Sequence, residues 1–176
     1  MINFINISNK KPFQIFKEKY DSAMNAGQEN IEAVAISSYN KKKRIVDSRF
    51  VNLKLLEFDK FIFFTNYTSS KSIDFESHDQ ISALIFWPSI NEQVRMKAII
   101  KKTSHSYNQD YFKTRSINKN ALAISSHQSK IIDSFNIVQE NFKQSLRNDD
   151  LKQCPKYWGG YSFMPYEIEF WEGNEF

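Results

Sequence analysis

Cysteine, glycine and histidine are scarce in this 176-residue sequence, and each shortage excludes a class of site. Cys154 is the single cysteine, so the chain forms no internal disulfide, and we expect a packed thiol in a reducing compartment. The four glycines do not form a Gly-rich phosphate loop. His78, His105 and His127 lie far apart without metal-ligand spacing, so no metal site is expected. A bound phosphate would therefore have to be held by cationic side chains and hydroxyls.

Long apolar runs and a strong charge bias are absent as well. No segment is apolar enough to span a bilayer, and residues 1–12 lack the apolar run of a signal peptide, which predicts a soluble, cytoplasmic protein. The chain has 24 Lys and Arg against 20 Asp and Glu, a net charge of +4. Adjacent basic residues occur in the run from Lys41 to Arg44, whereas the other lysines are scattered. This distribution favours small anionic ligands over nucleic acid.

Aromatic residues are abundant instead, with 16 Phe and 8 Tyr. Such side chains suit half-buried strands, and the 41% apolar content is enough for one core. We therefore predict a single barrel-like α+β domain over residues 1–176.

The expected elements follow from apolar spacing and turn residues. Phe13, Phe16, Tyr20 and Met24 recur at helical spacing, which predicts an opening helix over 11–28. Further helices are expected at 71–78, 104–115 and 131–146, and strands at 31–39, 44–58, 60–65, 80–87 and 93–103. A closing pair of strands, 157–163 and 166–171 on either side of Pro165, is expected within 156–176, the predicted dimerisation region.

Two clusters of side chains suit a phosphorylated ligand. Arg49 and Lys54 are expected on one strand, followed at the next strand end and helix start by Thr65, Ser69, Ser70 and Lys71. The second cluster is Tyr111, Arg115 and Lys119, whose spacing places a phenol and two cations on one helical face. The alternative for each is an ordinary solvated surface, which is the commoner outcome for such residues taken alone.

The order of motifs along nearly the whole chain resembles the pyridoxamine 5'-phosphate oxidase family, whose members are FMN-dependent split barrels that work as homodimers. The resemblance rests on the following segments, in chain order: Pro12, Phe13 and Phe16; 49–54 (RFVNLK); 63–66 (FFTN); 69–71 (SSK); 86–88 (FWP); 92–95 (EQVR); 111–115 (YFKTR); Gln128 and Ser129; 158–161 (WGGY); 168–173 (IEFWEG).

The resemblance implies an FMN-binding split β-barrel and assigns roles to individual residues. Arg49, Lys71 and the hydroxyls around Thr65 would hold the FMN phosphate, and a site shared by two subunits would use further contacts to the flavin or its chain. The implied cofactor-binding residues are Arg49, Phe50, Val51, Lys54, Phe64, Thr65, Ser70, Lys71, Gln93, Gln128, Ser129 and Trp171. The implied substrate-binding residues are Lys54, Tyr111, Arg115 and Lys119, which would grip the phosphate of a B6 vitamer. The implied reaction is hydride transfer from substrate C4' to flavin N5, with reoxidation by dioxygen, and no side chain is predicted as a catalytic acid or base.

Several positions depart from the family pattern. Ser70 and Glu92 stand where cations are common, which predicts a lower FMN affinity, and Lys119 stands where a serine is common. The sequence given ends at Phe176, where the family continues into an R-L-H-D-R motif over the B6 ring, so we expect substrate binding with slow oxidation. The alternatives are a related split-barrel flavoenzyme with another substrate and a non-catalytic FMN- or B6-phosphate-binding protein.

Overall fold

The computed structural model of the chain describes residues 1–126 and 128–173; His127 and the last three residues of the expected 156–176 region lie outside the described residues. The described chain divides into two compact units, and each is treated by itself below. The first consists of residues 1–64, 74–101 and 161 onward, and the second of residues 65–73 and 102–160. The prediction of one domain over 1–176 stays a prediction.

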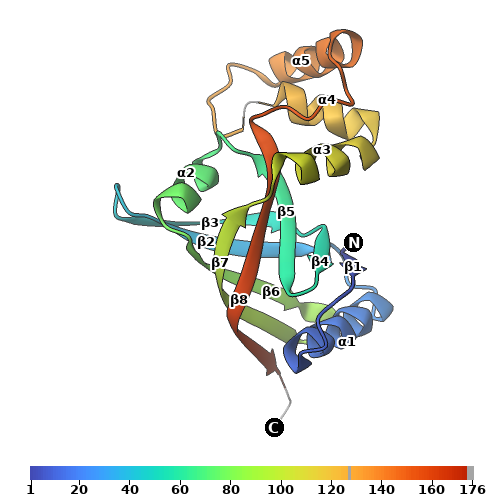
Figure 1. Cartoon of the computed structure of the whole chain (residues 1–176), viewed down its shortest axis with the longest axis vertical. Helices are drawn as coiled ribbons and strands as arrows, with labels where there is room; N and C mark the ends of the chain where they lie inside the picture. The colour runs from blue at the N-terminus through green and yellow to red at the C-terminus, as the bar shows by residue number, and fades with distance from the viewer. Residues whose placement is uncertain (127, 174–176) are drawn as a thin grey trace. The chain divides into compact units, whose positions relative to one another are not determined.

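An eight-stranded mixed sheet with the order β1-β4-β5-β8-β7-β6-β2-β3 is the main feature of the fold (Figure 1). Its strands are β1 (Asn3–Ile5), β2 (Ala33–Asn40), β3 (Ile45–Asn52), β4 (Leu55–Glu57), β5 (Lys60–Asn66), β6 (Gln80–Trp87), β7 (Glu92–Lys102) and β8 (Trp158–Glu172). The pairs β2–β3, β2–β6, β4–β5 and β6–β7 are antiparallel, and β1 lies parallel to β4.

The helices are α1 (Lys11–Asn25), α2 (Ser70–Ser77), α3 (His105–Thr114), α4 (Ile117–Ser125) and α5 (Phe135–Asn148), and a short 3₁₀ turn, η1, covers Pro88–Ile90. The expected opening helix is confirmed, with Pro12 in its first turn. It buries Phe13, Phe16 and Tyr20, but Ala23 takes the fourth buried position and Met24 is exposed. No described helix is long and apolar enough to cross a membrane.

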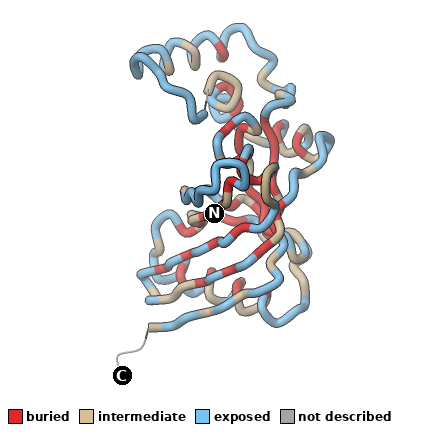
Figure 2. The backbone as a smooth tube through the Cα atoms, turned by 90° about the vertical axis from the view of Figure 1, so that its left-hand side faces the viewer, coloured by how far each residue is buried: buried red, intermediate tan, exposed pale blue. Residues whose placement is uncertain are grey.

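Aromatic rings fill the core of the first unit. Phe16 on α1 meets Phe61 on β5 edge to face, with ring centroids 4.9 Å apart, and Phe61 stacks on Phe163 of β8 at 5.3 Å. Trp87 on β6 completes the group and donates its indole N–H to the Ile31 carbonyl at 3.1 Å. These large side chains are almost fully buried, so their burial and ring packing contribute much of the unit's stability. Figure 2 shows buried and exposed positions alternating along the strands, the pattern of a sheet with one covered face.

Three expectations about the elements are wrong. Residues 44–58 form two strands, because the chain leaves the sheet after Asn52. The closing pair of strands is one continuous strand, β8, through Pro165. A pair would need a turn there, and Met164-Pro165-Tyr166 supplies no residue suited to a positive φ, whereas the proline ring's own φ is compatible with an extended backbone. Helix α4 was not expected at all, although Ser116 is a good cap for it.

Candidate functional site

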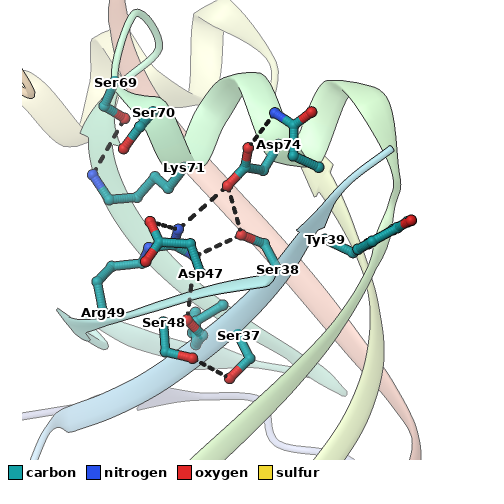
Figure 3. Close-up of polar contacts among 12 residues, drawn as sticks. Ser37, Ser38, Tyr39, Asp47, Ser48, Arg49, Ser69, Ser70, Lys71 and Asp74 are labelled. Atoms are coloured by element: carbon teal, nitrogen blue, oxygen red, sulfur yellow. Dashed lines mark hydrogen bonds and ion pairs between the residues drawn. The ribbon is translucent and has the colours of Figure 1, made fainter. Parts of the chain in front are cut away.

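A lysine and two hydroxyls meet in the second unit, where β5 ends and α2 begins. Lys71 Nζ donates to Thr65 Oγ1 at 3.1 Å and to Ser69 Oγ at 3.2 Å, and both hydroxyl residues are buried. Figure 3 shows Ser69, Ser70 and Lys71 at this helix start. Four of the six residues of the predicted cluster, Thr65, Ser69, Ser70 and Lys71, therefore lie together at the end of β5 and the start of α2.

Asn66 holds this loop in shape. Its carbonyl oxygen accepts from Ser69 Oγ at 2.7 Å and from Ser72 Oγ at 3.0 Å, and its side-chain oxygen accepts from the backbone N–H and the hydroxyl of Thr68, both at 2.7 Å. Because the buried hydroxyls are bonded in this way, the loop is preorganised before any ligand arrives.

Gln128 and Ser129, more than fifty residues later in the chain, reach the same loop. The Gln128 side-chain oxygen accepts from Thr65 Oγ1 at 3.1 Å and from the Asn66 N–H at 3.4 Å. Ser129 Oγ accepts from the Ser70 N–H at 3.3 Å, and Ser129 has a left-handed backbone with φ of 64°. The structure thus brings together five of the predicted cofactor residues: Thr65, Ser70, Lys71, Gln128 and Ser129.

Arg49 lies on β3 in the first unit and is surrounded by oxygen acceptors (Figure 3). Its Nη1 donates to Ser38 Oγ at 2.6 Å, and its Nη2 lies 2.7 Å from Asp47 Oδ2 and 3.3 Å from Asp74 Oδ2. Asp74 is buried and also accepts from Ser38 Oγ at 3.0 Å and Asn40 Nδ2 at 2.7 Å.

The two acidic partners of Arg49 were missed from the sequence. Asp47 could have been found, because residues two apart on a strand share a face. Asp74 is 25 residues from Arg49, and no sequence pattern connects them.

Lys54 does not lie on the strand that carries Arg49, contrary to expectation, because β3 ends at Asn52. Its Nζ pairs with Glu32 Oε1 at 3.6 Å. The remaining predicted cofactor residues of this unit lie on four strands. They are Phe50 and Val51 on β3, Phe64 on β5, Gln93 on β7 opposite Phe86, and Trp171 near the end of β8. Phe50 and Trp171 are exposed.

Tyr111, Arg115 and Lys119 do not share one helical face. Helix α3 ends at Thr114, Arg115 has an extended backbone, and Lys119 belongs to the next helix. The physical reason is Ser116, whose hydroxyl accepts from the Lys119 N–H at 3.4 Å and so starts α4.

The Arg115 guanidinium packs on aromatic rings within the second unit. Its Cζ lies 4.4 Å from the centroid of the Trp158 ring and 5.6 Å from that of Phe112, and its Nη2 donates to the Lys119 carbonyl at 3.0 Å. Its Nη1 is buried and has no hydrogen-bond acceptor among the described residues. Burial lowers the pKa of Arg115 and raises that of the neighbouring Tyr111 phenol. This buried donor suits an anion or another acceptor arriving from outside the chain.

Cys154 is buried, as expected for a packed thiol. Burial raises its pKa to about 11, so the thiolate is scarce at neutral pH and the residue is a poor nucleophile.

Comparison with known proteins decides the family. A pyridoxine/pyridoxamine 5'-phosphate oxidase of Pseudomonas syringae pv. tomato is 31% identical over 171 residues, which cover 95% of this chain and 79% of that protein. One of Flavobacterium psychrophilum is 34% identical over 166 residues, covering 93% and 77%. The chain belongs to the pyridoxine/pyridoxamine 5'-phosphate oxidase family. No family model matches the sequence.

Solved structures confirm the fold of this oxidase-family chain as an α+β split barrel. PhzG from Burkholderia lata 383, solved with tetrahydrophenazine-1-carboxylic acid, has a TM-score of 0.87 at 22% identity and covers 93% of this chain and 81% of its own. A pyridoxamine 5'-phosphate oxidase-related, FMN binding protein from Nostoc punctiforme has a TM-score of 0.73 at 11% identity and covers 89% and 84%.

The first testable prediction concerns Asp74. Asp74→Ala removes a buried carboxylate that accepts from Arg49, Ser38 and Asn40, so three donors lose an acceptor and a buried ion pair is broken. We expect the free energy of unfolding to fall by about 3 kcal/mol, measured by urea denaturation. Asp110→Ala is the control, since Asp110 is exposed and lies 3.9 Å from Lys113, and should change stability by less than about 0.5 kcal/mol. Equal effects of the two substitutions would contradict the role assigned to Asp74.

Proposed function

We propose that the chain is an FMN-dependent oxidoreductase of the cytoplasm that oxidises pyridoxamine or pyridoxine 5'-phosphate in B6 salvage. The observation that carries the proposal is the arrangement of Lys71 with the Thr65 and Ser69 hydroxyls. Family membership supports the same reading.

The donors at the start of α2 fit a terminal phosphate. A lysine, neighbouring hydroxyls and a helix N-terminus supply positive charge and hydrogen-bond donors without a glycine-rich loop. The roles of the other cofactor residues are proposed from the resemblance: Arg49 at the phosphate, and Phe50, Val51, Lys54, Phe64, Gln93, Gln128, Ser129 and Trp171 along the ribityl chain and ring. When bound, the flavin supplies the hydride acceptor, while these residues orient it and exclude water.

The substrate phosphate is proposed to bind at Tyr111, Arg115 and Lys119, with Lys54 assigned by the resemblance alone. Support comes from Arg115, whose buried Nη1 has no acceptor among the described residues. A phosphate oxygen would supply one.

Cofactor binding is tested by titration with FMN, FAD and riboflavin, followed by flavin fluorescence. We expect FMN to bind best, because the proposed donors converge on one terminal phosphate. Lys71→Ala should weaken FMN binding by about tenfold or more, the value of one charge-assisted contact, and should leave riboflavin binding unchanged. Lys60→Ala, which removes an exposed lysine of β5, is the matched control. Absence of saturable FMN binding by the unchanged protein would remove the proposed function.

Substrate binding is tested by titration with pyridoxal 5'-phosphate and by hydrogen peroxide release from pyridoxamine 5'-phosphate. Arg115→Ala should weaken pyridoxal 5'-phosphate binding by about tenfold or more. Lys113→Ala, which removes an exposed cation of α3 two residues before Arg115, should not. Equal affinity of Arg115→Ala and the unchanged protein would contradict the proposed substrate site.

A second candidate is a related flavoprotein that acts on another substrate or only binds its ligand. The observation that favours it is the Arg115 guanidinium, which already stacks on Trp158 and donates to the Lys119 carbonyl. Binding of FMN without binding of pyridoxal 5'-phosphate would select this candidate over the first.

We further propose a homodimer, supported by an exposed apolar row on the sheet of the first unit. Phe50 on β3 and Leu84 on β6 both lie opposite Ala35 of β2, and their exposed fractions are 75% and 39%. Apolar surface of this kind is commonly covered by a partner.

Light scattering of the FMN-loaded protein should give the mass of two chains. Leu84→Lys should shift the mass toward one chain, because the charge would be buried in the interface. Met24→Lys replaces an apolar residue of similar exposure, 42%, on α1 and should leave the dimer intact. A monomer that retains its flavin would refute the dimer.

A further inference from the structure

Two carboxylates share one guanidinium in the first unit, and their environments differ. Asp74 has 8% of its side chain exposed and accepts three hydrogen bonds, from Ser38, Asn40 and Arg49. Asp47 has 54% exposed, and its Oδ2 lies 2.7 Å from Arg49 Nη2. Asp74 is thus fixed by its surroundings, whereas the half-exposed carboxylate of Asp47 can rotate into solvent and be hydrated there.

The donors on both Nη atoms of Arg49 are already directed at acceptors of the chain. Nη1 donates to Ser38 Oγ and to the Ile36 carbonyl at 3.3 Å, and Nη2 lies within hydrogen-bond distance of both Asp47 and Asp74. Nη2 carries two hydrogens, so a phosphate oxygen that binds there must displace one carboxylate. Asp47 is the easier of the two to displace, because it is more exposed and accepts fewer hydrogen bonds.

The charges lead to the same conclusion. One guanidinium facing two carboxylates has a local balance of one negative charge, which repels a phosphate dianion. When Asp47 turns away, Arg49 and Asp74 are left as a neutral pair, and the repulsion falls.

We propose that Asp47 is an internal competitor for Arg49 Nη2, which a phosphate monoester displaces when it binds that nitrogen, and that Asp47 therefore weakens binding of the ligand. The inference rests on the proposed function, in which Arg49 binds the FMN phosphate. Asp74 remains in place and holds the guanidinium during the exchange. Asp47 thereby limits affinity for the phosphorylated form of the ligand without affecting contacts to its ring.

The test compares Asp47→Asn with the unchanged protein in titrations with FMN and with riboflavin, at one pH and ionic strength. FMN should bind about three- to tenfold more tightly to Asp47→Asn, the range expected when a partly exposed ion pair no longer competes. Riboflavin lacks the phosphate, so its affinity should not change. Asp59→Asn is the matched control, because it also removes one negative charge from this unit but Asp59 pairs with Lys10.

A double-mutant cycle tests whether Asp47 acts through Arg49. In an Arg49→Gln background, adding Asp47→Asn should change FMN affinity less than twofold. Circular dichroism of each variant confirms that the fold is retained.

The outcomes separate this inference from the proposed function. If the unchanged protein binds FMN and Asp47→Asn binds it equally or more weakly, the competitor role of Asp47 is refuted. The proposed function still stands in that case. An equal gain in Asp59→Asn, or an undiminished gain in the Arg49→Gln background, also overturns it. Absence of saturable FMN binding by the unchanged protein removes the proposed function, and the inference, which rests on it, is removed as well.

Discussion

Aromatic packing is the interaction on which the first unit depends. Phe16 brings α1 against the sheet, and its contacts with Phe61 and Trp87 join the helix to two strands that are distant in the sequence. Edge-to-face and stacked rings restrict orientation more than aliphatic contacts do, so this packing fixes position as well as supplying apolar burial. Arg49 and Asp47 lie on β3 at the edge of the sheet built on this core, and Asp74 reaches Arg49 from helix α2.

The loop proposed to bind a phosphate is built from polar side chains, and these must be satisfied inside the protein. Hydroxyls at Thr65, Ser69 and Ser72 are buried, so each needs a partner, and Asn66 and Lys71 provide several of them. The loop is consequently rigid before a ligand binds. A glycine-rich loop would use backbone groups instead and would not require this set of buried polar contacts.

Sequence patterns predicted the elements with strong periodicity, and they grouped Thr65, Ser69 and Lys71, which the structure places in contact. Helix α1 and strand β6 were found because their apolar residues repeat clearly. The resemblance assigned both Thr65 and Gln128 to the cofactor, and the structure joins their side chains by a hydrogen bond although 63 residues separate them. Two wrong predictions concern places where local chemistry competes with periodicity. Ser116 caps a new helix and so separates Arg115 from Lys119, and Pro165 continues a strand where a turn was expected. The contact of Asp74 with Arg49 is set by tertiary packing, so it cannot be predicted from the spacing of residues in the sequence.

The turn between β2 and β3 has a consequence for how copies of the chain meet in concentrated solution. β3 is the last strand in the sheet order, and such an edge offers backbone groups to any other extended chain. The adjoining turn presents Lys41, Lys42, Lys43 and Arg44, all exposed. Two copies that approached edge to edge would bring these like charges together, so the basic turn protects the exposed Ile45 and Val46 of β3 against aggregation by strand addition.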